Sequence, residues 1–509
     1  MNTKRNHRRR TPSIEAIKRE PPARFEGGAY RPLSDSQCEQ ITFSAFEILH
    51  KIGIAEAPEW LRRQLIERGA RQREDGRITF DPGRIEAALQ RASHRVSLPG
   101  FDEQFGLDIG NACVHIGTGG AAVQTLDAET GQYRNSTLSD LYRMMRVLDR
   151  CEHVHYGIRP LVARDMTTPL DLDLNTAYAC LRATQKPIGT SFHSAAHVPQ
   201  VTRLFDLALG GENRFRRQPF CFGVIVHVVS PLRFSTEGVD IMRAAIEAGM
   251  PLQICTAGQA GATSPASLAG ALAQGLAESI AGTLIVDAIK PGHPCIYAFL
   301  PFISDLRTGA MTGGSGESAI ANAAAAQLLH RLQMPATVSA GMTDSKIEDV
   351  QAGYEKGYSV ALAAQAGADM INLSVGMLGS IMVASPESLL IDNDMCGAVL
   401  RTVRGIEVTD EMLDLESIER VVCGEGHYLG EPQTLQLMKS EYLYPELGDR
   451  QSVADWLDAG AETIWQRACS QVHEILDEPP SGHLTPAADR KIRELFDIKL
   501  RGNPNASKT

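Results

Sequence analysis

The side chains best suited to chemistry lie where predicted strands end. Short apolar segments stop near Phe192, His193, His227 and Phe299, and another stops before the loop 341–346. Imidazoles serve as acids, bases or metal ligands, and aromatic rings bind organic cations. If the strands are parallel, their carboxyl ends meet at one edge, where the active sites of α/β barrels are built. The loops after these strands therefore form the candidate site.

Carboxylates and an amide lie in or beside the same loops. Asp344 follows a predicted strand, and either Thr343 or Asp344 can cap the helix that comes next. Gln351 and Glu355 are four residues apart on that helix, so they share one face. Glu317 opens another helix after a glycine-rich loop. There it either points into the site or stabilises the helix dipole.

A second interpretation is a metal-dependent hydrolase barrel. His153 and His155 share one face of a predicted strand, and His227 lies near the end of another. A binuclear hydrolase uses a His-x-His pair on its first strand together with histidines on later strands. Against this interpretation, His153 and His155 stand at the start of their strand, which is the end of a barrel opposite its active site.

Alternating strands and helices must position these residues. We predict strands near 154–158, 187–192, 220–229, 251–256, 294–299, 335–340 and 370–375, with an eighth near Val421. Helices are predicted at 175–183, 199–209, 234–248, 264–288, 317–332 and 347–366. Alternation of this regularity indicates a parallel sheet, and seven or eight units fit a (β/α)8 TIM barrel better than a doubly wound sheet.

The chain divides into four predicted segments. We expect a disordered basic tail at 1–33, N-terminal helices and β-hairpins at 34–150, the barrel at 151–420 and a helical extension at 421–509. The first helix begins near Ser34 or Asp35, either of which can cap it.

The composition excludes several classes of protein. The 509 residues are 43% hydrophobic with a net charge of −11, which is typical of a folded chain. Eight of the cations fall within the first 24 residues, and the remaining acidic body is a poor nucleic-acid binder. The apolar runs fall short of the roughly 18 residues of a membrane span, so we expect no membrane. Ten cysteines without a Cys-x-x-Cys pair indicate buried thiols in a reducing cytoplasm.

Several ordered motifs together resemble the trimethylamine methyltransferase family, in its branch without pyrrolysine. The motifs run from a Gly-Ala-Thr-Ser-Pro segment to a Gly-His-Tyr-Leu-Gly-Glu-Pro segment, at 261–270, 290–294, 305–309, 314–317, 340–346, 349–356 and 426–435. They span most of residues 250–445, and a run in this order is far more specific than any single short motif.

The resemblance implies a (β/α)8 barrel that demethylates a methylated amine and passes the methyl group to the Co(I) of cobalamin on a separate corrinoid protein. Pyrrolysine stands before a Thr/Ser-Asp-Ser-Lys motif in the trimethylamine enzymes, and Met342 occupies that position here. This departure favours a quaternary amine such as glycine betaine, proline betaine or carnitine. Family members that use glycine betaine have histidine at the Met342 position and an aromatic residue at the Val350 position, so a pocket for another betaine is one hypothesis.

Site residues follow from the resemblance and the loop positions together. Catalytic roles are expected for Met342, Asp344 and Glu317. An ammonium group attracts aromatic faces, for which Phe192, Phe299, Phe302 and Tyr354 are candidates, and a substrate carboxylate attracts His193 or His227. Val350 and Gln351 complete the predicted pocket, no resident metal is expected, and a homo-oligomer is expected.

Overall fold

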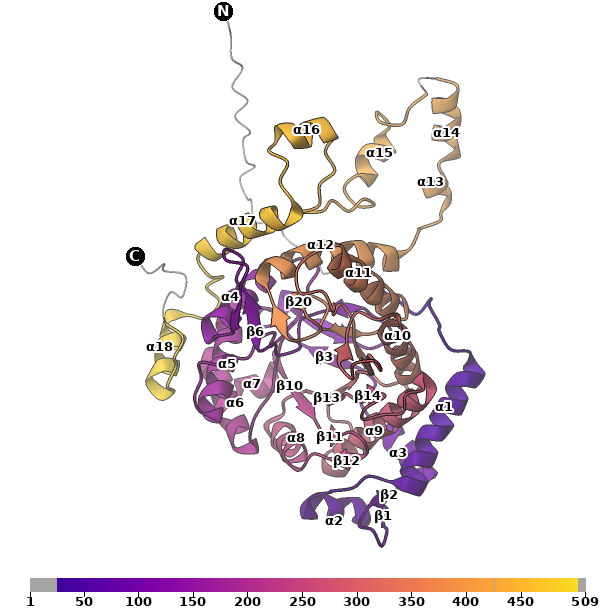
Figure 1. Ribbon diagram of the computed structural model, residues 1–509, viewed down its shortest axis with the longest axis vertical. Coiled ribbons are helices and arrows are strands. Elements are labelled where there is room, and N and C mark those ends of the chain that lie inside the picture. The colour runs from indigo at the N-terminus through magenta and orange to yellow at the C-terminus, as the bar shows by residue number, and fades with distance from the viewer. Residues whose placement is uncertain (1–24, 425, 502–509) are drawn as a thin grey trace, which may run out of the picture.

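A closed barrel of eight parallel strands forms the centre of the molecule in a computed structural model that describes residues 25–424 and 426–501 (Figure 1). The strands are β5 (His115–Ile116), β8 (Gly157–Ile158), β9 (Ile188–Thr190), β10 (Cys221–Val226), β13 (Leu252–Thr256), β15 (Cys295–Phe299), β18 (Ala336–Ser339) and β19 (Met370–Asn372). A parallel bridge between Gly117 and Tyr156 joins β5 to β8 and closes the ring. The (β/α)8 prediction is confirmed.

A helix follows each strand and packs outside the barrel. In chain order these helices are α4 (Leu138–Arg150), α5 (Pro169–Ala183), α6 (Val198–Ala208), α8 (Thr236–Ala248), α9 (Leu268–Ile289), α10 (Gly316–Arg331), α11 (Val350–Gln365) and α12 (Pro386–Arg404). Between α6 and α8 lies the short α7 (Arg214–Arg217). Most bounds fall within a few residues of those predicted. Helix α11 is capped by Asp349. The prediction that Thr343 or Asp344 caps this helix was therefore wrong.

The predicted eighth strand near Val421 was also wrong. Val421 lies in a helix, and the remaining barrel strand is β5, which comes from the segment expected to hold N-terminal hairpins. The barrel therefore begins before residue 151. A strand of two residues is too short to show which sheet it joins, so this segment was assigned to the N-terminal hairpins and not to the barrel.

We call the end of the barrel that holds the carboxyl ends of its strands the mouth. Short β-strands in the loops form small sheets there. One sheet combines β6 (Gln124–Leu126), β7 (Tyr133–Asn135), β20 (Met377–Leu378) and β21 (Val383–Ala384). A second combines β14 (Gln259–Ala260), β16 (Phe302–Ser304) and β17 (Met311–Thr312), and a third pairs β11 (Val228–Val229) with β12 (Arg233–Phe234). These sheets stiffen the loops that line the mouth.

The N-terminal segment closes the opposite end of the barrel and covers one side. It contains α1 (Asp35–Glu47), capped by Ser34 as predicted, α2 (Glu59–Glu67), α3 (Pro82–Arg91), the β1–β2 pair (Arg71–Gln72, Ile78–Thr79) and the β3–β4 hairpin (Val96–Leu98, Leu107–Ile109). The β3–β4 hairpin packs under the barrel against interior side chains such as Phe222 and Met370. The predicted basic tail falls mostly on residues 1–24, outside the described residues. Phe25, Tyr30 and Leu33 pack against the core, so disorder was wrongly expected there.

Helix α9 is long and apolar enough to cross a membrane, yet 89% of its most apolar stretch is buried inside the molecule. The barrel strands cover its inner side, and α1, α2 and α3 cover its outer side. A helix buried on both sides is hydrophobic all round, so α9 is a core helix.

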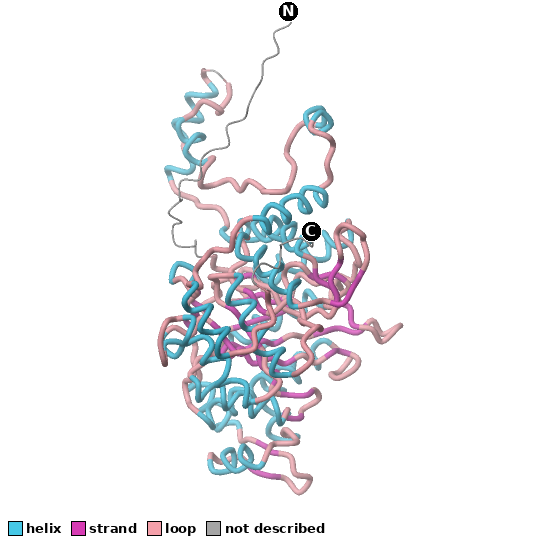
Figure 2. Tube along the Cα trace, turned by 90° about the vertical axis from the view of Figure 1, so that its left-hand side faces the viewer, coloured by secondary structure: helices cyan, strands magenta, loops and turns pink. Residues whose placement is uncertain are grey.

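The C-terminal segment packs partly on the barrel and partly projects from it (Figures 1 and 2). Its helices are α13 (Asp410–Leu413), α14 (Leu415–Val422), α15 (Pro432–Leu437), α16 (Val453–Asp458), α17 (Ile464–Asp477) and α18 (Pro486–Leu495). Helix α17 packs on α4 and α12, and α18 packs on α6.

Candidate active site

The floor of the mouth is a chain of hydrogen bonds inside the barrel. The Tyr156 hydroxyl donates to Asn372 Oδ1 at 2.7 Å, and Asn372 Nδ2 donates to Gln253 Oε1 at 2.9 Å. Gln253 Nε2 then donates to Thr337 Oγ1 at 3.3 Å. All four side chains are buried, and each uses its polar atoms on a neighbour. Such a satisfied network holds the strands in register and leaves a polar floor.

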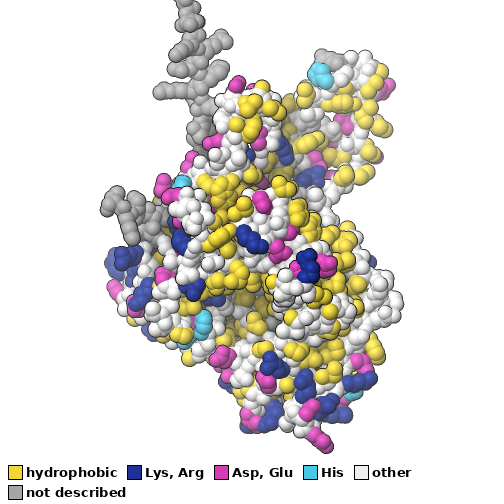
Figure 3. Space-filling view, viewed as in Figure 1, with side chains coloured by type: hydrophobic (Ala, Val, Ile, Leu, Met, Phe, Trp, Pro, Cys, Tyr) yellow, Lys and Arg dark blue, Asp and Glu magenta, His cyan; other side chains and the backbone are white. Residues whose placement is uncertain are grey.

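One wall of the mouth is apolar. Cys255, Ala298 and Leu300 form a buried cluster against which the partly buried Val224 and Phe302 pack. In the view of Figure 3, hydrophobic side chains gather around a hollow near the centre of the molecule. Phe302, one of the predicted aromatic candidates, is the ring that belongs to this wall. An apolar wall with an aromatic ring suits an organic cation better than a strongly hydrated ion.

An oriented histidine follows β9 at the mouth. His193 donates through its backbone N–H to Asp173 at 2.8 Å, and its Nδ1 lies 2.7 Å from the other carboxylate oxygen. His197 Nδ1 lies 2.6 Å from the same Asp173. The Asp173 carboxylate is wholly buried, whereas 45% of the His193 side chain is exposed. Because Asp173 holds Nδ1, the free Nε2 is the atom available to a ligand.

Asp344 ties three mouth loops together. Its carboxylate accepts hydrogen bonds from the hydroxyls of Thr312 and Ser380 and from the N–H of Gly313 at 3.0 Å. Burial alone would raise the pKa of Asp344, but these hydrogen bonds outweigh it and hold the pKa below its usual value. Asp344 is thus a loop anchor, and a direct catalytic role for it stays a prediction.

Glu355 supports the same loop from α11. It accepts hydrogen bonds from the Thr343 hydroxyl at 2.6 Å, from the Asp344 N–H at 2.8 Å and from Gln351 Nε2 at 2.9 Å. The prediction that Gln351 and Glu355 share a face is confirmed. Gln351 therefore positions a carboxylate, and its contact with a substrate stays a prediction.

Met342 is completely buried beneath the glycine-rich loop that follows β17. A Cβ added at Gly313 would lie 2.6 Å from the Met342 Cβ. Only glycine allows this approach, so the loop covers the methionine closely. Met342 thus helps to shape the mouth from below and does not line its surface.

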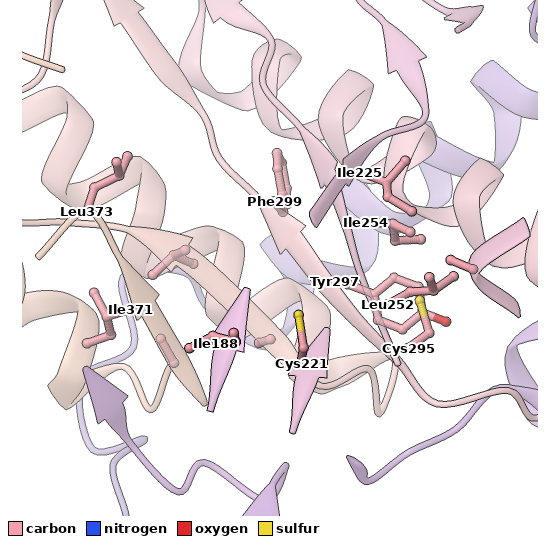
Figure 4. Close-up of a cluster of buried hydrophobic side chains, with 14 of the residues drawn as sticks. Ile188, Cys221, Ile225, Leu252, Ile254, Cys295, Tyr297, Phe299, Ile371 and Leu373 are labelled. Atoms are coloured by element: carbon pink, nitrogen blue, oxygen red, sulfur yellow. The ribbon is translucent and has the colours of Figure 1, made fainter. Parts of the chain in front are cut away.

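Two predicted ligand-binding residues face away from the mouth. The Phe299 ring packs against Gly275 of α9, in the layer between strands and helices that Figure 4 shows with Tyr297, Ile254 and Ile225. His227 packs against Gly282 of the same helix, and its Nε2 lies 2.9 Å from the Glu278 carbonyl. Burial lowers the pKa of His227 to about 4, so it stays neutral. Neither side chain can contact a ligand in the mouth of this structure.

The other candidates are divided between core and rim. Phe192 is nine-tenths buried in the main core. Val350 and Tyr354 are 85% and 56% exposed on the first turns of α11, at the rim of the mouth. Glu317 is exposed in the first turn of α10, where its charge favours the helix N-terminus. Rim positions can meet a docked partner more readily than a small ligand inside the barrel.

The histidines of the hydrolase interpretation do not converge. His153 packs against Gly397 of α12, and His155 accepts the Ile116 N–H through Nδ1 at 2.9 Å. His227 lies in the layer beside α9. Within residues 25–424 and 426–501, no three His, Cys, Asp or Glu side chains are grouped as a metal site would require. The hydrolase alternative therefore has no ligand set in this structure.

Sequence reasoning missed Asp173 because it lies twenty residues before His193, on helix α5. The only available signal was the spacing of His193 and His197, which are one helical turn apart. Val224, Cys255 and Leu300 were also missed, since inward and outward apolar residues look alike in a sequence of buried strands.

The chain is similar to one family model and to several known methyltransferases. The sequence matches the family described as trimethylamine methyltransferase (MTTB) over residues 2–502. A glycine betaine methyltransferase of Desulfitobacterium hafniense (strain Y51) is 27% identical over 92% of this chain and 96% of its own. The trimethylamine methyltransferase MttB of strain DSM 10664 / DCB-2 is 28% identical over 89% and 91%. The crystal structure of the monomethylamine methyltransferase of Methanosarcina barkeri aligns with a TM-score of 0.46 at 11% identity, covering 89% of this chain and 96% of that one. On the match across residues 2–502, the chain belongs to the trimethylamine methyltransferase family.

Proposed function

We propose that this methyltransferase demethylates a quaternary amine that carries a carboxylate, and passes the methyl group to a separate corrinoid protein. The proposal rests on two features at the carboxyl ends of the barrel strands: an apolar wall containing Phe302 after β15, and the exposed His193, held by Asp173, after β9. The wall suits a trimethylammonium group, and the imidazole suits a carboxylate.

A quaternary amine also suits the chemistry that this chain can offer. Its nitrogen is already positively charged, so when the C–N bond breaks, the electron pair stays on nitrogen and a neutral tertiary amine leaves. No general acid is needed for that departure. The protein must mainly bind the ammonium, exclude water and hold one N–CH3 bond in line with the methyl acceptor. Met342 fills the position where relatives of the trimethylamine branch carry pyrrolysine, which supports a substrate that needs no such residue.

The residues of the rim fit a methyl acceptor brought by a partner. Leu306, Ile347, Val350, Tyr354 and Met382 are all more than half exposed in the loops and first helical turns around the mouth. An exposed apolar rim around an open mouth suits transient docking of another protein. The Co(I) of a cobalamin carried by that partner would supply the nucleophile that takes the methyl group. Val350 and Tyr354 are therefore proposed as partner contacts.

We also propose a cytoplasmic location. All ten cysteines are free thiols, and eight of them are buried. Free thiols are typical of a reducing compartment.

The test measures methyl transfer from a panel of amines to free cob(I)alamin. The loss of Co(I) absorbance reports the transfer. The panel contains glycine betaine, proline betaine, carnitine, choline and trimethylamine. We expect turnover with at least one carboxylated quaternary amine, slower turnover with choline and none with trimethylamine. Turnover with trimethylamine alone, or with none of the five, would contradict the proposal.

A further inference from the structure

The segment 405–463, which we call the arm, leaves the body after α12 and returns to it at α17. Figures 1 and 2 show it projecting beyond the barrel, with α13 to α15 in one lobe and α16 in another. It also carries the motif 426–435, to which neither the barrel nor the mouth assigns a role. The arm is therefore a built element that needs its own explanation.

The middle of the arm is fastened to α12. The Asp394 carboxylate accepts hydrogen bonds from the backbone N–H groups of Glu446 at 2.9 Å and of Leu447 and Gly448 at 2.8 Å. Arg401 and Arg404 on the same helix pair with Glu441. Both lobes thus project from a fixed anchor, so their direction is set by the fold.

Apolar side chains cover the arm on its exposed side. On α14, Leu415, Ile418 and Val422 share one helical face and are 73%, 43% and 71% exposed. Of the 28 exposed large hydrophobic side chains in the described part of the chain, 14 lie between residues 405 and 463. The arm holds about an eighth of the chain, so its apolar residues are concentrated several-fold.

The apolar surface of the arm matches a stable interface in size. The fourteen large side chains are 43% to 85% exposed and together present on the order of 1,000 Å². The largest apolar patch of a typical monomer covers roughly 300–600 Å², and a standard stable interface buries about 800 Å² on each partner. A surface of this size needs a partner that is always present.

We propose that a second copy of this chain covers the arm. A corrinoid protein that docks and leaves with each turnover would expose the arm between visits, whereas a second copy is present from synthesis onward. The arm has fourteen acidic and three basic residues, so two arms side by side would repel each other. Each arm therefore lies against the body of the other copy. Because both copies make the same contact, the dimer is closed and has two-fold symmetry.

The test combines sedimentation equilibrium with one matched pair of variants in the full chain. Ile418→Glu places a charge on the exposed face of α14, and Ile66→Glu does the same on α2, where Ile66 is 42% exposed. We expect wild type and Ile66→Glu to sediment as two chains of 55.2 kDa or a multiple of two, and Ile418→Glu to fall to a single chain. Unchanged circular dichroism establishes that both variants fold.

A cysteine probe reports on the arm itself. Cys423, directly after α14, is the exposed cysteine, while eight others are buried and Cys469 is half-buried. Its reaction with a maleimide should slow as protein concentration rises through the dimerisation range in wild type, and should stay fast in Ile418→Glu. A wild-type chain that sediments as a monomer at 50 μM, or a dimer unaffected by Ile418→Glu, would overturn the proposal.

One further variant tests whether residues 1–24 of the same chain, and not a second copy, cover the arm. The basic segment 1–24 could cover an acidic arm of its own chain, so Arg8, Arg9 and Arg10 are changed to Gln in the full chain. We expect this variant to remain dimeric, with Cys423 still protected. Loss of protection in a chain that is monomeric throughout would assign the arm to residues 1–24 and refute the second copy.

Discussion

Replacing Asp173 by Asn tests how the candidate site is organised. The carboxylate is wholly buried and accepts three hydrogen bonds, from the His193 N–H and from the two imidazole Nδ1 atoms of His193 and His197. Asn keeps one acceptor oxygen but replaces the other oxygen with an NH2 group. That NH2 group is a donor, so it cannot accept a hydrogen bond from an N–H of His193 or His197. One imidazole therefore loses its partner and turns.

The size of the effect follows from these bonds. A hydrogen bond to a charged group contributes about 1.5–3 kcal/mol, and a buried donor left without a partner costs a similar amount. We expect the free energy of unfolding of Asp173→Asn to fall by about 3 kcal/mol. Loss of an oriented His193 should also lower kcat/KM for a carboxylated amine by about 10- to 100-fold, which corresponds to about 1.4–2.8 kcal/mol.

The assays are urea denaturation and steady-state methyl transfer to cob(I)alamin. Asp171→Asn is the control, because Asp171 is on the same helix but lies in its first turn, away from the histidines. For choline, which has no carboxylate, Asp173→Asn should change kcat/KM much less. Wild-type stability and kinetics in Asp173→Asn would refute the geometry. Lower stability with unchanged kinetics toward carboxylated amines would refute the role of His193.

Three further predictions concern the wall, the loops and the core. Phe302→Leu keeps an apolar side chain but removes the ring, so KM for a quaternary amine should rise by about 3- to 30-fold. This rise is equivalent to a cation–π contact of about 0.6–2 kcal/mol. The free energy of unfolding should change little. The pKa of Asp344 lies below its unfolded value of about 3.9, so its contribution to stability is complete above that value and is lost as pH falls through the folded pKa. Unfolding in urea between pH 5 and pH 3 should therefore show a smaller loss of stability in Asp344→Asn than in wild type, and equal losses would contradict the loop-anchor role. His227 has a pKa of about 4 against about 6.5 when unfolded, so the unfolded chain binds the extra proton between these values and stability falls as pH decreases. Between pH 7 and pH 5, wild type should lose about 2 kcal/mol more than His227→Gln, and an equal loss would show that His227 is not buried as a neutral imidazole.

The barrel could be predicted because seven of its strands are apolar segments alternating with helices of ordinary length. The eighth strand, β5, has only two residues, and its place in the sheet depends on ring closure with β8. No local pattern reports ring closure, so a helix near Val421 was mistaken for the missing strand. The length of the barrel was therefore underestimated at its N-terminal side.

The candidate site was predictable only as a set of loops. His193 was found because it follows a strand, but its partner Asp173 comes from a helix on the outer layer. Phe299 and Phe302 are three residues apart, yet one packs on α9 and the other lines the mouth. A shift of one residue in a strand moves a side chain to the other face, so strand ends known to within two residues cannot assign these roles.

The central claim is that this chain moves a methyl group from a quaternary amine to cobalamin. Its most direct test incubates the purified protein with cob(I)alamin and a betaine whose N-methyl groups are all trideuterated, and analyses both products by mass spectrometry. We predict cobalamin carrying a trideuteromethyl group together with an equal amount of the demethylated tertiary amine. Unlabelled cobalamin after incubation with every betaine in the panel would contradict the claim.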